Sequence, residues 1–192
     1  HRVHRRQRQM CIRDSPKGAW RYSPESKDAD TTITGAQLVA LFASKNAGID
    51  VPDEAIAKGK KFLLECQDKR GGFGYTGNSG ANLPRTAIGS LILALSEDTN
   101  SKAYKASVEY LRQNSAFGDQ GHKFYSLYYT AQAMFRSSPE DWNRWNLTNV
   151  RQLQASQSDN GSWTGNYGTT FATSAALLSM ALNYRYLPIY ER

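Results

Sequence analysis

A short motif that pairs a small residue with an aromatic one occurs four times, and it constrains the fold more than any other feature of the sequence. The four occurrences are Gly18-Ala19-Trp20, Gly71-Gly72-Phe73, Ala116-Phe117-Gly118 and Gly161-Ser162-Trp163. Successive aromatic residues are 53, 44 and 46 positions apart. Recurrence at this spacing is typical of proteins built from stacked helical hairpins.

The segment that follows each motif, after a polar loop, consists almost entirely of small and apolar residues. These segments are residues 33–43, 86–95, 124–135 and 171–182. A helix that is apolar on all sides is normally buried on all sides. We therefore expect four fully buried helices that form an inner layer.

Amphipathic segments alternate with the apolar ones. Within residues 55–66 the apolar side chains share one helical face, and charged side chains fill the other. The same stripe returns at residues 104–111 and, more weakly, at residues 150–153. A helix of this kind has one side in water, so these segments predict an outer layer.

Helix start signals support the division into two layers. Polar N-caps and prolines in the first turn mark helix beginnings. The sequence offers such signals at Pro52-Asp53, Pro84, Ser101, Thr32 and either Thr169 or Thr170. Together these patterns predict an all-α chain of about seven helices, in antiparallel hairpins and without strands.

The net charge of +7 is concentrated at the N-terminus. Residues 1–16 hold five arginines and one aspartate, so the rest of the chain carries only +3. Residues 1–16 show no helical or strand period and no signal-peptide run, and residues 7–15 resemble translated adapter or vector sequence. We expect this segment to be non-native and disordered, with a natural basic tail as the alternative. Residues 17–192 then form the domain, and nucleic acid is not an expected partner.

One stretch carries a motif with the spacing of a known repeat. It consists of Lys58-Gly59, Phe62-Leu63, Gln67, Gly71 and Phe73. This resembles the QW repeat of squalene-hopene cyclases and oxidosqualene cyclases. Its second half recurs as Leu153, Gln157, Gly161 and Trp163, and its first half as Lys105-Ala106 and Tyr110-Leu111. A glutamine amide can bind backbone groups of the following loop, and glycine allows a sharp turn, so we expect these residues to be structural.

The chain also resembles bacterial proteins that carry prenyltransferase and squalene oxidase repeats. Residues 18–24, 28–37 and 184–192 carry this similarity, which extends over residues 17–192. The resemblance implies a partial α/α toroid, the C-terminal part of a barrel with concentric inner and outer helices. It leaves two functions open: a binding or scaffolding module without a complete catalytic site, and a terpene cyclase.

The one candidate catalytic motif is Asp28-Ala29-Asp30-Thr31-Thr32. It is similar to the Asp-x-Asp-Asp-Thr motif of squalene-hopene cyclases, in which the middle aspartate protonates a terminal alkene. The resemblance implies that Asp30 is the general acid and Asp28 a second acid, whereas Thr31 stands where the third carboxyl would be. Capping of the next helix explains the same residues, and both interpretations stay open.

Aromatic side chains gather on one predicted inner helix, at Phe124, Tyr125, Tyr128 and Tyr129. An aromatic-lined cavity could hold an isoprenoid chain or stabilise carbocations. We therefore name these three tyrosines and Trp20 as candidate substrate-binding residues, although core packing accounts for most of the cluster. The expected partner is an apolar, isoprenoid-like ligand or another protein.

We expect no cofactor and no metal. After residue 16 the chain has a single histidine, His122, and a single cysteine, Cys66, so the ligands of a zinc-dependent prenyltransferase are missing. His122 is predicted to lie in a loop or at a helix start, and Cys66 to fill space in the core. No apolar run is long enough to predict a transmembrane helix.

Overall fold

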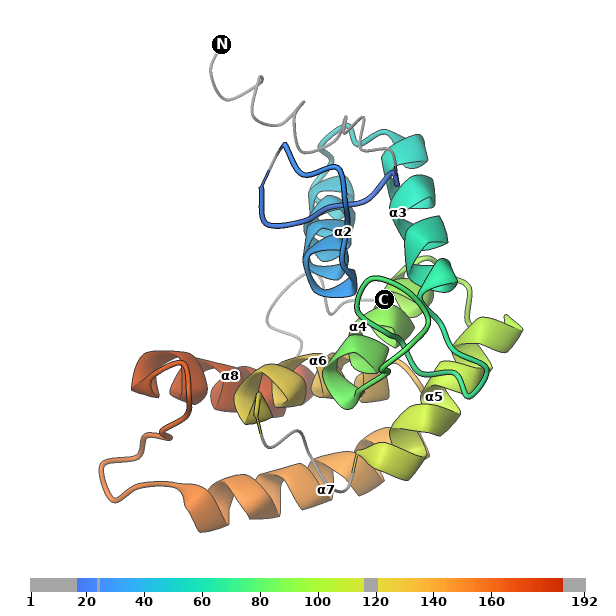
Figure 1. Cartoon of the computed structure of the whole chain (residues 1–192). Helices are drawn as coiled ribbons and strands as arrows, with labels where there is room; N and C mark the ends of the chain where they lie inside the picture. The colour runs from blue at the N-terminus through green and yellow to red at the C-terminus, as the bar shows by residue number, and fades with distance from the viewer. Residues whose placement is uncertain (1–16, 24, 116–120, 185–192) are drawn as a thin grey trace.

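The computed structural model describes residues 17–23, 25–115 and 121–184 of the 192-residue chain. The described part contains seven α-helices, one short 3₁₀ helix and no strand (Figure 1). They are α2 (Thr31–Asn46), α3 (Asp53–Glu65), α4 (Leu83–Leu95), α5 (Lys102–Asn114), α6 (Lys123–Phe135), α7 (Pro139–Ser156), α8 (Thr169–Ala181) and η1 (Leu182–Tyr184). The predictions made for residues 1–16, for the motif at 116–118 and for most of 184–192 fall outside the described residues.

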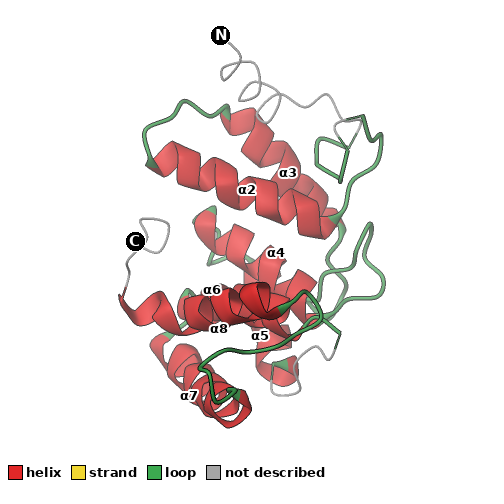
Figure 2. Ribbon diagram, turned by 90° about the vertical axis from the view of Figure 1, so that its left-hand side faces the viewer, coloured by secondary structure: helices red, strands yellow, loops and turns green. Residues whose placement is uncertain are grey.

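The helices form two layers (Figure 2). Helices α2, α4, α6 and α8 pack against one another in that order. The outer helices cover them: α3 contacts α2 and α4, α5 contacts α4 and α6, and α7 contacts α6 and α8. The inner helices are the four apolar segments and the outer helices are the amphipathic ones, so the predicted all-α architecture is confirmed.

Burial of the inner helices is less uniform than the sequence predicts. Helix α4 lies between α2 and α6 and buries ten of its thirteen residues. Helix α8 has an inner neighbour on one side only, and it exposes 39% of Phe171 and 53% of Leu177. Helix α2 likewise buries only five of its sixteen residues. The expectation that all four apolar helices are buried on every side is therefore wrong for α2 and α8, because within the described residues each of them packs against only one other inner helix.

Most helices begin at a polar cap. Asp30 caps α2, Asn82 caps α4, Ser101 caps α5 and Ser138 caps α7 through their side-chain oxygens. Three start signals are confirmed in position, at Pro52-Asp53, Pro84 and Ser101.

The N-caps predicted at threonine positions are wrong. Thr32 lies inside α2, because the carboxyl of Asp30 two residues earlier takes the capping role. Thr169 and Thr170 lie inside α8, whose N-cap is Gly168 with a φ of 86°. Glycine adopts this positive φ without strain, so the turn itself sets the start of α8.

The loops with a glycine and an aromatic residue make the same hydrogen bonds at several places. In the three loops that the structure describes, the aromatic residue donates its backbone N–H to a threonine hydroxyl on an inner helix. These pairs are Trp20 with Thr34 (3.0 Å), Phe73 with Thr86 (3.0 Å) and Trp163 with Thr173 (3.1 Å). In addition, Gln67 and Gln157 donate their side-chain amides to the carbonyls of Gly71 (3.1 Å) and Gly161 (2.8 Å). The loops are thus tied to both layers.

Candidate functional site

The Asp30 carboxyl is fully buried at the N-terminus of α2 and serves as its cap. Its Oδ1 accepts hydrogen bonds from the backbone N–H groups of Thr32 and Ile33 (both 2.9 Å) and from the Thr32 hydroxyl (2.5 Å). Its Oδ2 is also buried, and within the described residues it has no hydrogen-bond partner. One oxygen therefore caps the helix, and the other is enclosed without a hydrogen bond inside the described part of the chain.

Asp28 lies at the surface and makes ion pairs. Its side chain is 51% exposed, and its carboxyl contacts Arg21 and, at 3.7 Å, Lys17. The two aspartates of the motif therefore have different surroundings, because only Asp30 is inside the protein. A proton donor in a water-poor cavity needs burial, and Asp28 does not have it.

Thr31 ties α2 to the loop before α4. Its hydroxyl donates to the carbonyls of Gly74 (2.7 Å) and Tyr75 (3.0 Å), and its backbone N–H donates to Tyr75 as well (2.9 Å). In the similar cyclase motif this position carries a carboxylate. Here it carries a buried hydroxyl whose donor role is purely structural.

Tyrosines from two other parts of the chain lie within electrostatic reach of Asp30. Tyr75 comes from the loop before α4, and Tyr125 comes from the first turn of α6. Burial, a hydrogen bond with Tyr22 and the negative charge of Asp30 raise the pKa of Tyr75 to about 12. The pKa of Tyr125 is raised far above its ordinary value, mainly by burial. Tyr129 adds to this rise, and the negative charge of Asp30 adds more weakly. Both phenols are therefore neutral at physiological pH.

The predicted aromatic cluster on α6 is present as a set of packed rings. The ring of Tyr129 stands edge-on to those of Tyr125 and Tyr128, with centroids 5.0 and 4.9 Å apart. Burial, followed by the proximity of Tyr128, raises the pKa of Tyr129 to about 12. Tyr129 lies in the core, whereas Tyr125 and Tyr128 are half-buried, so these two have surface left for a ligand.

Trp20 lies away from these tyrosines. It belongs to the core cluster between α2 and α3, next to Leu38 and Gly59. A Cβ on Gly59 would come within 2.9 Å of the Trp20 ring. The carbonyl of Trp20 accepts the backbone N–H of Asp30 (3.0 Å), so Trp20 adjoins Asp30 through its backbone while its ring packs in the core.

Tyr75 and the two arginines beside it were not among the residues predicted from the sequence. The guanidinium carbons of Arg21 and Arg85 each lie 5.7 Å from the centroid of the Tyr75 ring. Cations over an aromatic face are attracted by its quadrupole. The only sequence signal for Tyr75 is that an aromatic residue stands in a glycine-rich loop. No sequence pattern indicates that this loop lies against Asp30.

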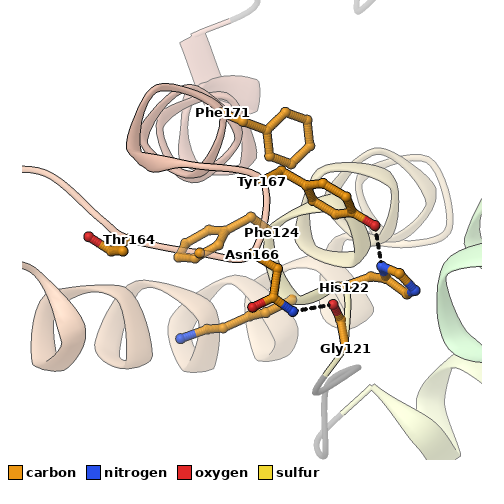
Figure 3. A pocket seen from close by; sticks show the side chains of 9 residues that line it. Gly121, His122, Phe124, Thr164, Asn166, Tyr167 and Phe171 are labelled. Carbon is orange, nitrogen blue, oxygen red and sulfur yellow. Dashed lines mark hydrogen bonds between the residues drawn. The ribbon is translucent and has the colours of Figure 1, made fainter.

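A separate pocket of about 190 Å³ opens between the starts of α6 and α8 (Figure 3). The hydroxyl of Tyr167 lies 2.6 Å from Nδ1 of His122, and the amide of Asn166 donates to the carbonyl of Gly121 (2.8 Å). Phe124 and Phe171 add apolar walls. His122 is the N-cap residue of α6, as the prediction of a helix-start position requires.

The remaining candidates are metal-binding side chains and Cys66. Among the residues that the structure describes, no three His, Cys, Asp or Glu side chains gather in a way that could hold a metal ion. Cys66 is buried in the core, and burial raises the pKa of its thiol. A buried neutral thiol is a poor nucleophile, which agrees with its predicted role as a core residue.

No protein-family model and no curated protein matches this chain. The helices that the structure describes include none with the length and apolar character needed to cross a bilayer.

Proposed function

We propose that this chain is a repeat domain similar to those of squalene cyclases and prenyltransferases, part of an α/α toroid, and that it works as a binding or scaffolding module without a complete catalytic site. The observation that carries the proposal is the structural use of the whole acidic motif. Asp28 pairs with Arg21, Asp30 caps α2, and Thr31 bonds the loop before α4.

The hairpin contacts support the same proposal. The hydrogen bonds of Gln67, Gln157 and the three loop aromatics all end on backbone or threonine groups of the fold. Residues used in this way join helices and perform no chemistry. These contacts therefore fit a binding or scaffolding module better than they fit an enzyme.

The direct test is product analysis. The purified chain is incubated with squalene in detergent micelles, beside an Asp30→Asn variant that keeps the cap geometry but cannot donate a carboxylic proton. The scaffold proposal expects no cyclised product from either protein. A product that the wild type forms and Asp30→Asn does not form would overturn it.

A terpene cyclase with Asp30 as general acid remains the second candidate, because of one observation. Oδ2 of Asp30 is buried without a hydrogen-bond partner in the described part of the chain, and the charge of this carboxylate contributes to the raised pKa values of Tyr75 and Tyr125. If Oδ2 carried a proton, its transfer to an alkene would leave a carboxylate on Asp30 and a carbocation on the substrate. Aromatic rings could stabilise that carbocation. On this account Tyr125→Leu lowers product formation by about tenfold or more, whereas Tyr110→Leu, away from Asp30, leaves it unchanged.

A further inference from the structure

The pocket between the starts of α6 and α8 is large enough for one ring-sized molecule (Figure 3). Its volume is about 190 Å³. A protein cavity of about 150 Å³ is sufficient to hold a benzene molecule, whereas pockets for drug-sized ligands begin at about 300 Å³. The pocket therefore has room for one six-membered ring with a small substituent.

Hydrogen bonds between its two sides hold the pocket in shape. The hydroxyl of Tyr167 lies 2.6 Å from Nδ1 of His122, and the amide of Asn166 donates to the carbonyl of Gly121 (2.8 Å). Both contacts join the loop before α8 to the residues at the start of α6. Because they fix the two sides relative to each other, a ligand would enter a preformed site, which lowers the entropic cost of binding.

The walls of the pocket are aromatic rings. Phe124 forms one wall, and the loop backbone lies directly against its ring, since a Cβ on Gly165 would be 2.7 Å from Cδ2 of Phe124. Tyr167 and Phe171 meet edge to face with centroids 5.4 Å apart, and they are 56% and 39% exposed. Covering exposed ring surface with another ring is favourable, so the pocket favours a flat aromatic ligand.

The charge of the pocket comes from Lys123. Among the described residues that line it, Lys123 is the only lysine or arginine, and none is an aspartate or glutamate. Its Nζ lies 5.4 Å from the centroid of the Phe124 ring, beside the aromatic wall. No carboxylate in the described part of the chain forms an ion pair with Lys123. A negatively charged ligand would therefore complement this ammonium group.

We propose that this pocket binds a small aromatic carboxylate. The ring of the ligand would lie against Phe124, Tyr167 and Phe171, and its carboxylate would pair with the ammonium group of Lys123. The inference goes beyond the scaffolding proposal and does not rest on it, because the pocket shares no residue with the acidic motif at residues 28–32.

The test compares benzoate with its neutral isostere benzamide. Both molecules carry the same ring, and only benzoate carries a charge. NMR titration of the full chain measures the two affinities, and the amide resonances that shift identify the binding site. Benzoate should bind saturably, with a Kd of about 1 mM or lower, and should shift residues 121–124 and 164–171. Benzamide should bind about threefold to fivefold more weakly, because it lacks a partly exposed ion pair.

Three variants separate the charge from the ring, and circular dichroism establishes that each is folded. Lys123→Gln should weaken benzoate binding about threefold to fivefold and leave benzamide binding unchanged. Phe171→Ala removes one wall and should weaken the binding of both molecules about fivefold. Leu177→Ala is its control and should change neither affinity, because Leu177 is exposed on the same helix but does not line the pocket.

Three results would overturn the proposal. One is the absence of saturable benzoate binding, and another is a set of shifted resonances that excludes residues 121–124 and 164–171. The third is an equal loss of benzoate and benzamide affinity in Lys123→Gln, which would show that Lys123 does not recognise the charge. Squalene has neither an aromatic ring nor a charge, so none of these results bears on the product assay. Failure of this inference and failure of the proposed function are therefore distinguishable.

Discussion

At the scale of single residues, the clearest feature is a charged pair that joins two outer helices. Arg112 on α5 donates from Nε and Nη2 to the two carboxylate oxygens of Asp141 on α7, at 2.8 and 2.7 Å. The Asp141 side chain is only 6% exposed. Ser138 donates to the same carboxylate (3.0 Å), so Asp141 is held by three bonds in a fixed geometry.

Substitution of Asp141 by asparagine should lower the free energy of unfolding by about 1 to 2 kcal/mol at pH 7, a range reduced because Arg112 is partly exposed. Arg112 lowers the pKa of Asp141 in the native state. The pair therefore stabilises fully above the unfolded-state pKa of about 3.9, and its contribution is lost as the pH falls through the lower native pKa. Urea unfolding from pH 7 to pH 2 measures this dependence.

The matched control for this pair is Asp53→Asn. Asp53 pairs with Lys45 at 2.6 Å, but its side chain is 84% exposed. An exposed ion pair contributes less than about 1 kcal/mol, so this variant should unfold almost like the wild type. Equal losses for Asp53→Asn and Asp141→Asn would contradict the account of the α5–α7 contact.

A second residue-scale prediction concerns the threonines that hold the loops. Thr86 accepts the backbone N–H of Phe73, and both residues are fully buried. Replacing Thr86 by valine keeps the shape and leaves this N–H without a partner, at a cost of about 1 to 3 kcal/mol. Thr76→Val, at an exposed position, is the control. Chemical denaturation that finds the two variants equally stable would show that the loop bond is unimportant.

At the scale of elements, α2 and α4 are in close contact at Gly35. A Cβ on Gly35 would lie 2.0 Å from Cγ2 of Ile88, a fully buried side chain of the core. Glycine in a helix interior normally destabilises it by about 1 kcal/mol relative to alanine. Its presence at this point is explained by the contact between the two helices.

Gly35→Ala should therefore destabilise the protein despite its gain in helix propensity, by about 1 to 3 kcal/mol as expected for overpacking. Combining it with Ile88→Ala, which removes the colliding methyl group, should cost less than the sum of the two single changes. Gly77→Ala, where no atom lies within 4 Å of the added Cβ, should have little effect. A stabilised Gly35→Ala variant in thermal unfolding would contradict the observed helix packing.

At the scale of the whole molecule, the order of the layers could be predicted from the sequence, because the period and extent of apolar residues report burial directly. The length of α7 could not. Only its last part shows an apolar stripe, and its start at Ser138-Pro139 is a local capping signal that was missed. The exposed face of α8 could not be predicted either, since burial of an end helix depends on which neighbours are present.

The candidate site was predictable only in part. The sequence places two acids before an inner helix and tyrosines on another, and the negative charge of Asp30 adds to the burial that raises the pKa of Tyr125. The contrast between a buried Asp30 and an exposed Asp28 depends on Arg21, Tyr75 and the loop before α4. These are contacts between distant segments, and no local pattern encodes them.

The central claim is that the acidic motif holds the fold together, and the most direct measurement is the free energy of unfolding of Asp30→Ala beside that of Asp30→Asn. Loss of the cap should cost Asp30→Ala about 0.5 to 2 kcal/mol, whereas asparagine is an equally good N-cap and should leave the free energy of unfolding nearly unchanged. An Asp30→Ala variant more stable than the wild type would contradict the claim, because it would identify Asp30 as an acid kept for function at the expense of stability.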